Sequence, residues 1–242
     1  MTAKVDSYLV TGASSGIGHA VAQALLERGH RVIGLGRDES RMNVTDPAFQ
    51  FLKCDLADLD VLPERLAALH SELPRIKGAV LCAGAGRFGS LEEFSFTQIR
   101  ELVDINVTAQ MYVARTVLPT FKTRGAGDLI LLGSEAALAG ARRGTVYAGT
   151  KFALRGFCQA LRQEASRCGV RVALINPGMV DTAFFDDLDF APGEAPENHL
   201  RAEDIAAVVC TVLDMPPSAV IDEINLSPLK KVVRRKPHRN TK

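Results

Sequence analysis

The sequence predicts a single α/β domain built on a parallel sheet. Short apolar runs rich in β-branched residues alternate with longer segments of helical periodicity along nearly all of the 242 residues. This alternation is the pattern of βαβ units. A chain of this length with 47% hydrophobic residues can bury a sizeable core in one domain. Since no linker or internal repeat interrupts the pattern, we expect one domain over residues 1–227.

Seven segments are predicted to be strands, and helical pattern fills most of the gaps between them. The strands are expected at 7–12, 30–36, 49–54, 78–84, 127–133, 170–178 and 219–226. The clearest amphipathic helix runs from 146 to 167, and Gly169 would end it. Right-handed crossovers then give a Rossmann-like, doubly wound, parallel seven-stranded sheet with helices on both faces. Such a sheet places its ligand crevice at the carboxyl ends of the strands.

Charge is unevenly distributed along the chain. The formal net charge is +1, but residues 228–242 hold seven Lys or Arg and no acid. We expect this segment to be a flexible, basic C-terminal tail. A basic tail can also bind nucleic acid, an anionic membrane or an acidic partner. The remainder of the chain offers no basic motif that would support nucleic-acid binding, so we do not expect that partner.

Cysteine usage and hydropathy predict the cellular compartment. The five cysteines are scattered, with no CxxC pair and no histidine at metal-ligand spacing, which favours a reducing compartment and no metal site. No stretch approaches the roughly 20 apolar residues that a membrane-spanning helix needs, and the N-terminus does not resemble a signal peptide. We therefore expect a cytoplasmic protein without membrane insertion.

A glycine-rich loop follows the first predicted strand and leads into an Ala- and Leu-rich helix. It consists of Thr11, Gly12, Ala13, Ser14, Ser15, Gly16, Ile17 and Gly18. Its GxxxGxG spacing is one residue longer in the first gap than the dinucleotide fingerprint GxGxxG. Glycines let the backbone approach a pyrophosphate, whose charge is stabilised by free N–H groups and the dipole at a helix N-terminus. The alternative is a turn without a ligand, but the strand before it and the helix after it favour a cofactor loop.

These eight residues resemble the cofactor loop of the classical short-chain dehydrogenases, and the other motifs follow in that family's order over residues 5 to about 226. In the family, an acidic residue ending the second strand binds the adenosine ribose and selects NAD. Here that place is taken by Gly36, followed by Arg37. An arginine can bind the 2′-phosphate that a carboxylate would repel. We therefore expect NADP(H), with NAD(H) as the alternative if Arg37 is only a surface residue.

Two further segments resemble parts of the family's cofactor site. Asp55 and Leu56 match an Asp-Leu pair that contacts the adenine. Ala83 and Gly84 match the end of an Asn-Asn-Ala-Gly segment beside the ribose, although Cys82 stands where the family usually has Asn. This departure predicts that a side-chain hydrogen bond at this point of the sheet is lost or replaced, while the backbone of Ala83 and Gly84 keeps its role.

Three residues predict proton transfer. Tyr147 and Lys151 are four residues apart near the start of a helix, so both side chains project from one face. Ser134 precedes Tyr147 by thirteen residues, which is the family's spacing. An un-ionised tyrosine can donate a proton to the developing alkoxide, and an ammonium about 4 Å away would lower the tyrosine pKa by up to about three units. Ser134 would hydrogen-bond the substrate oxygen. The resemblance adds a contact of Lys151 with the nicotinamide ribose.

The resemblance implies roles for two more segments. Asn106 matches a family asparagine that holds a water in a proton relay behind the lysine. A segment that contacts the nicotinamide is matched by Pro177, Gly178, Val180 and Thr182. Without the resemblance, Asn106 would be interpreted as a solvent-facing or back-bonding side chain, and the Pro-Gly pair as an ordinary turn.

Residues 183–200 are predicted to form a flexible lid that decides the substrate. Its three phenylalanines would cover an apolar pocket or belong to the core, and Arg142 and Arg143 would bind a substrate carboxylate or remain solvated. The short lid and the last predicted strand resemble the branch of the family that contains dehydrogenases of 3-hydroxy acids and small β-hydroxy amino acids.

Together these features predict an oxidoreductase that transfers a hydride between NADP(H) and a small carbonyl or hydroxy compound, for which a 3-hydroxy acid is one candidate. The alternative is a non-catalytic NADP(H)-binding sensor. The joint presence of Ser134, Tyr147, Lys151 and Asn106 argues against a sensor. By analogy with the family, we expect a homodimer or homotetramer.

Overall fold

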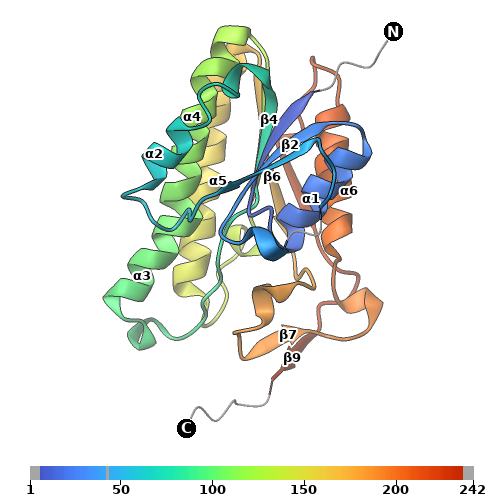
Figure 1. Ribbon diagram of the computed structural model, residues 1–242. Helices are drawn as coiled ribbons and strands as arrows, with labels where there is room; N and C mark the ends of the chain where they lie inside the picture. The colour runs from blue at the N-terminus through green and yellow to red at the C-terminus, as the bar shows by residue number, and fades with distance from the viewer. Residues whose placement is uncertain (1–5, 42–43, 237–242) are drawn as a thin grey trace.

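A parallel sheet runs through the middle of the structure, a computed structural model that describes residues 6–41 and 44–236 (Figure 1). Its strand order is β3-β2-β1-β4-β5-β6-β8, and every pairing is parallel. The strands are β1 (Ser7–Thr11), β2 (Arg31–Gly36), β3 (Phe49–Lys53), β4 (Ile76–Leu81), β5 (Gly127–Leu132), β6 (Val170–Pro177) and β8 (Glu223–Leu226). The prediction of a Rossmann-like, doubly wound seven-stranded sheet is confirmed.

Helices cover both faces of this sheet (Figure 1). One face carries α1 (Gly16–Glu27) and α6 (Ala202–Asp214), and the other carries α2 (Leu62–Ala67), α3 (Phe96–Val103), α4 (Ala109–Arg124) and α5 (Thr145–Ala165). Successive side chains of a strand point to opposite faces. Leu9 of β1 accordingly packs in the cluster that contains Phe121 of α4, while its neighbour Val10 packs with Leu25 of α1. Strands buried on both faces explain the continuous apolar runs in the sequence.

A small antiparallel pair lies outside the main sheet. Strand β7 (Phe190–Pro192) pairs with β9 (Val233–Arg235), and Figure 1 shows the pair at the bottom of the molecule. Residues 228–236 of the predicted tail thus return to the predicted lid through this strand pair. Residues 237–242 of that tail lie outside the described residues.

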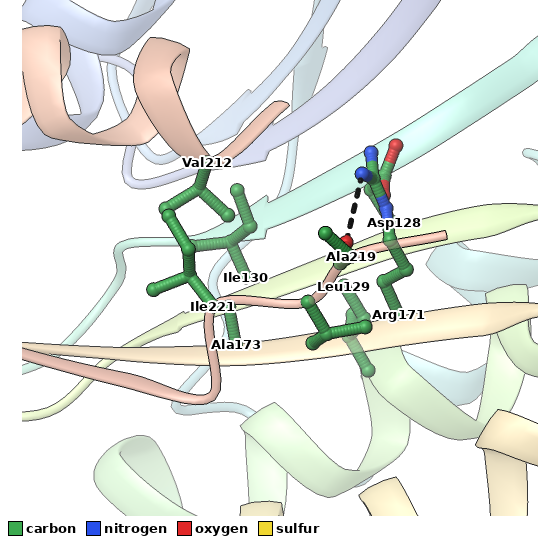
Figure 2. Close-up of a pocket in the computed structure, with 9 residues that line it drawn as sticks. Asp128, Leu129, Ile130, Arg171, Ala173, Val212, Ala219 and Ile221 are labelled. Carbon is green, nitrogen blue, oxygen red and sulfur yellow. Dashed lines mark hydrogen bonds and ion pairs between the residues drawn. The ribbon is translucent and has the colours of Figure 1, made fainter. Parts of the chain in front are cut away.

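A small hollow lies at the amino ends of β5 and β6, as Figure 2 shows. Its walls are mostly apolar, and its polar contact is an ion pair in which Arg171 Nε donates to Asp128 Oδ1 at 2.6 Å. The same guanidinium donates to the carbonyl oxygens of Met215 (2.6 Å) and Ala219 (3.5 Å). This arginine therefore holds the segment after α6 against the sheet, which is a structural role. Within the described residues, no helix is long and apolar enough to cross a membrane.

Candidate active site

Loops that follow four of the parallel strands meet at one edge of the sheet, because the carboxyl ends of parallel strands lie together. The glycine loop follows β1 and touches the loop after β4: a Cβ on Gly12 would lie 3.1 Å from the Cα of Ala83. The same loop touches the segment after β6, since a Cβ on Gly16 would lie 3.4 Å from Thr182 Cγ2. Ser134 follows β5. The structure thus brings the predicted cofactor and catalytic segments together.

The glycine loop presents an uncapped helix N-terminus. Helix α1 begins at Gly16, its N-cap residue Ser15 makes no side-chain capping hydrogen bond, and its first turn contains no acid. Its terminal N–H groups and dipole are therefore suited to an anion. Gly12 and Gly16 have φ values of 68° and 53°, which favour glycine. The loop also lies against the end of β2, because a Cβ on Gly36 would be 3.0 Å from Ser14 Oγ.

Gly18 lets α1 approach the loop closely, and Gly18→Ala is expected to disrupt this contact. A Cβ at this position would lie 2.3 Å from the carbonyl oxygen of Gly12 and 2.9 Å from that of Thr11. Overpacking of this kind costs roughly 1–3 kcal/mol, so thermal unfolding should show a Tm lower by several degrees. The matched control is Gly156→Ala in α5, where a Cβ meets nothing within 4 Å. It should raise stability by up to about 1 kcal/mol. Equal Tm values for both variants would contradict the argument.

The ends of β2 and β3 carry the candidate reader of the adenosine phosphate. Arg37, the first residue after β2, is exposed at this edge. The Cys54 N–H donates to the Gly36 carbonyl oxygen at 2.7 Å, which holds Asp55 near the end of β2. The Asp55 carboxylate accepts the Ala57 N–H at 3.0 Å. The Leu56 side chain is 4% exposed and belongs to the core, so its predicted contact with the adenine would come from its backbone.

The predicted proton-transfer residues lie together beneath this edge. They are Ser134, which follows β5, and Tyr147 and Lys151, which lie on helix α5. Both helix residues lie in the first two turns of α5 and are buried, with 7% and 6% of their surfaces exposed. The Lys151 Nζ lies 5.7 Å from the centroid of the Tyr147 ring and donates to the Leu132 carbonyl oxygen at 3.0 Å. A Cβ on Gly84 would lie 3.8 Å from the same Nζ, so the loop after β4 is adjacent to the lysine. Helix α5 thus positions two of the three side chains, and the segment after β5 positions the third.

Burial sets the protonation of both helix residues. It raises the pKa of Tyr147 to about 12, against a hydrogen bond with Ser134 that lowers it, and Glu135 raises it further. Burial also lowers the pKa of Lys151 to about 8. The pKa of Tyr147 therefore moves opposite to the direction expected from the sequence, because desolvation of the phenolate outweighs the hydrogen bond with Ser134. At neutral pH, Tyr147 is un-ionised and able to donate a proton.

Asn106 lies in a π-helical turn between α3 and α4 and is 1% exposed. Its Oδ1 accepts the Ala85 N–H at 2.9 Å, and its Nδ2 donates to the Ala85 carbonyl oxygen at 2.9 Å and to Thr150 Oγ1 at 3.1 Å. The solvent-facing alternative is therefore wrong. Asn106 ties the loop after β4 to the catalytic helix, as π-turns at functional sites often do. Its predicted hold on a relay water stays a prediction.

The segment after β6, predicted to contact the nicotinamide, leads from the sheet edge to residues 183–200. Pro177 ends β6, and the Gly178 N–H donates to the Leu226 carbonyl oxygen at 2.7 Å. Val180 is buried and forms an isolated bridge with Leu200. Residues 183–200, which we call the lid, therefore begin and end beside each other. From there the lid covers Tyr147 with aromatic side chains.

The comparisons with known proteins agree with this geometry. The model of the short chain dehydrogenase family matches residues 7–191. The chain belongs to this family. An uncharacterized oxidoreductase of Staphylococcus epidermidis is 30% identical over 226 residues, which are 91% of this chain and 96% of the relative.

Two solved structures show how far the fold is shared. The closed form of a serine dehydrogenase complexed with NADP+ is 26% identical, with a TM-score of 0.80, and the match covers 91% of this chain and 94% of that one. An alcohol dehydrogenase from the archaeon Thermococcus sibiricus, complexed with 5-hydroxy-NADP, is 25% identical, with a TM-score of 0.83 and coverage of 92% and 96%. Both matches span nearly the whole short-chain dehydrogenase domain.

Two side chains hold the backbone next to Cys82, the departure from the family pattern. The Ala83 N–H donates to Thr11 Oγ1 at 3.1 Å, and Gln110 Nε2 donates to the Ala83 carbonyl oxygen at 2.8 Å. Whether these bonds replace that of the usual Asn stays a prediction. Sequence reasoning did not find Gln110, although it follows Asn106 by four residues and so faces the same side of the helix.

Asn176 holds the backbone of Ser134 in this short-chain dehydrogenase. Its Oδ1 accepts the Ser134 N–H at 3.2 Å, and its Nδ2 donates to Glu223 Oε1 at 2.7 Å and Asn225 Oδ1 at 2.9 Å. The two β8 residues fix the orientation of the amide and were not found from the sequence. Their signal is the spacing of two polar residues with one residue between them in the last strand, which puts both on one face.

Four cations within residues 228–236 are matched by carboxylates of the same chain. We call residues 228–236 the strap. Its four ion pairs join Lys230 to Glu197 (3.2 Å), Lys231 to Glu135 (2.5 Å), Arg234 to Glu194 (3.6 Å) and Arg235 to Asp189 (3.1 Å). Three of these acids belong to the lid, and Glu135 follows Ser134 in the chain. Charge complementarity between the strap and the lid is the physical reason that this segment does not form a separate tail.

Proposed function

We propose that this short-chain dehydrogenase transfers a hydride between NADP(H) and a small carbonyl or hydroxy compound. The observation that carries the proposal is the burial of Tyr147 and Lys151 beside Ser134, at the same sheet edge as the glycine loop. A buried, un-ionised tyrosine is suited to donate a proton to a carbonyl oxygen that gains negative charge. A non-catalytic sensor would bind the cofactor without turnover.

NADPH, when bound, supplies the hydride that adds to the carbonyl carbon. The C=O π bond breaks, and the oxygen takes a proton from Tyr147 Oη, which yields the alcohol and NADP+. The Ser134 Oγ accepts the Ala136 N–H at 3.1 Å and its hydroxyl is hydrogen-bonded to Tyr147. A substrate oxygen placed between the two hydroxyls would receive hydrogen bonds from both. Lys151 would hold the nicotinamide ribose, because its Nζ lies beside the loop after β4.

The residues of the site fit NADP(H). The uncapped N-terminus of α1 suits a pyrophosphate, and Gly36 places no carboxylate at the end of β2. Arg37 is exposed at the same edge and would bind the 2′-phosphate. The similar serine and alcohol dehydrogenases carry NADP+ and 5-hydroxy-NADP, which supports the same cofactor here.

Arg37→Ala is expected to weaken NADPH binding by roughly 10- to 100-fold and to leave NADH binding nearly unchanged. The reason is the loss of a charge-assisted hydrogen bond to the 2′-phosphate, which NADH lacks. Fluorescence titration at fixed salt measures both affinities. Arg28→Ala is the matched control, because Arg28 lies at the far end of α1 and pairs with Asp214. A wild-type preference for NADH, or an unchanged NADPH affinity in Arg37→Ala, would contradict the proposal.

Two finer expectations belong to this proposal. The family branch suggested a 3-hydroxy acid as substrate, and the similar serine dehydrogenase is named after serine, a small β-hydroxy amino acid. The homodimer or homotetramer expected from the family would be tested by sedimentation of the full chain. Both stay predictions.

A further inference from the structure

Five aromatic rings form a closed circuit of contacts around the catalytic tyrosine. We call the four phenylalanines of this circuit the aromatic cage. The ring centroids are 5.0 Å apart for Tyr147 and Phe88, 5.0 Å for Phe88 and Phe190, 5.7 Å for Phe190 and Phe185, 5.2 Å for Phe185 and Phe184, and 6.1 Å for Phe184 and Tyr147. Three of the phenylalanines come from the lid and Phe88 from the segment after β4.

The cage covers the reacting hydroxyl. Tyr147 is 7% exposed and Phe185 8% exposed, while Phe88, Phe184 and Phe190 are partly buried. The Phe184 ring packs directly against Gly86: a Cβ added to Gly86 would lie 2.2 Å from Phe184 Cζ. A substrate that reaches Tyr147 must therefore move in among these rings and replace part of their mutual contact. An apolar or aromatic group replaces that contact with little loss, whereas a charged group would have to be desolvated.

Charges around the cage disfavour a carboxylate on the substrate. Three cations form ion pairs: Lys231 with Glu135, Arg235 with Asp189, and Arg143 with Glu93 at 3.5 Å. The ammonium of Lys236 donates to the carbonyl oxygens of Phe185 and Asp186. A substrate carboxylate that bound one of these four cations would have to displace its partner. The lid also carries the exposed acids Asp186 and Asp187, which would repel a carboxylate on the substrate.

We propose that the substrate is a ketone or aldehyde whose non-reacting group is apolar, preferably aromatic, and that the aromatic cage binds this group. The inference rests on the proposed function and replaces the 3-hydroxy acid with a different substrate class. Within the lid, Phe184 is the phenylalanine that contacts Tyr147, and it also contacts Phe185, so it is the specificity-determining residue to test.

The test compares two methyl ketones of similar length in NADPH-dependent reduction by the full chain. One is 4-phenyl-2-butanone, and the other is 4-oxopentanoate, which carries a carboxylate. Burial of the phenyl group predicts a kcat/KM roughly 10- to 100-fold higher for the first. Phe184→Ala and the milder Phe184→Leu should lower that value more for the phenyl ketone than for 4-oxopentanoate, so the ratio of the two kcat/KM values should fall. Phe96→Ala is the control, because Phe96 is 93% exposed on α3.

The outcomes separate the inference from the proposed function. A preference for 4-oxopentanoate in turnover that depends on Tyr147 overturns the inference and leaves the function intact. The absence of Tyr147-dependent turnover with any ketone overturns the function. Calorimetry of the full chain with NADP+ then decides the inference by itself: 4-phenyl-2-butanol should bind at least about 10-fold more tightly than 3-hydroxybutyrate. Equal or reversed affinities would overturn it.

Discussion

Tyr147→Phe is expected to lower kcat for NADPH-dependent carbonyl reduction by about 10²- to 10⁴-fold, the usual contribution of a positioned general acid. The substitution removes the hydroxyl and keeps the ring, so the contacts with Phe88 and Phe184 should persist. Affinity for NADPH should change little. The loss should therefore appear in single-turnover rates as well as in the steady state, because it concerns the chemical step.

Tyr112→Phe is the matched control for this experiment. Tyr112 is a partly buried tyrosine on α4, where its backbone carbonyl oxygen accepts the Thr116 hydroxyl, so loss of its phenol leaves that bond intact. Its kcat should equal that of the wild type. Retained turnover in Tyr147→Phe would assign the proton to another group. Tight NADPH binding by a wild type that turns over no substrate would favour the sensor alternative.

The sequence predicted the sheet well because the inner strands β1, β2, β4, β5 and β6 are buried on both faces, which leaves a continuous apolar run between turn residues. The predicted strand at 219–226 is the least accurate, since β8 covers only Glu223–Leu226. Its polar residues Glu223 and Asn225 accept hydrogen bonds from Asn176 and do not belong to the apolar core. The pair β7 and β9 was missed because three-residue strands carry almost no periodicity.

The site could be predicted as far as local motifs extend. The glycine loop, Ser134 and the pair on α5 each depend on neighbours in the sequence or on one strand end. Contacts between distant segments have no such signal. The ion pair of Lys231 with Glu135 joins residues 96 positions apart, and the cage joins Phe88 to Phe190. Composition showed that the tail is basic, but only the fold shows that the lid supplies its counter-charges.

Lys151→Met is expected to raise the stability of the cofactor-free protein at pH 7 and to abolish turnover. Burial lowers the Lys151 pKa from 10.5 to about 8, which corresponds to a penalty of about 3 kcal/mol for the charged form. Within the described residues, no carboxylate forms an ion pair with this ammonium. Loss of the hydrogen bond to Leu132 offsets about 1 kcal/mol, so the net gain should raise Tm by several degrees.

The pH dependence identifies the cause of this gain. Because the folded pKa of Lys151 lies below the unfolded value, the folded state binds fewer protons between about pH 8 and 10.5. The destabilising effect of the charged Lys151 should therefore be fully present below about pH 8 and should disappear as pH rises to about 10.5. The wild-type free energy of unfolding should gain the corresponding amount across that window. The raised pKa of Tyr147 acts in the opposite direction, between about pH 10 and 12. The advantage of Lys151→Met should shrink as pH rises from 8 toward 10.5.

Urea unfolding at several pH values measures that difference. Lys122→Met, a replacement in the last turn of α4, is the control and should show no such pH-dependent advantage. If the free energy of unfolding of Lys151→Met exceeded that of the wild type by the same amount at pH 7 and pH 10, the stabilisation would come from packing and not from the loss of charge. The buried Lys151 ammonium destabilises the cofactor-free protein. In the proposed function, the hydroxyls of the bound cofactor would solvate this ammonium and offset the penalty. NADPH should therefore stabilise the wild type more than Lys151→Met, and the same titrations with cofactor present would show it.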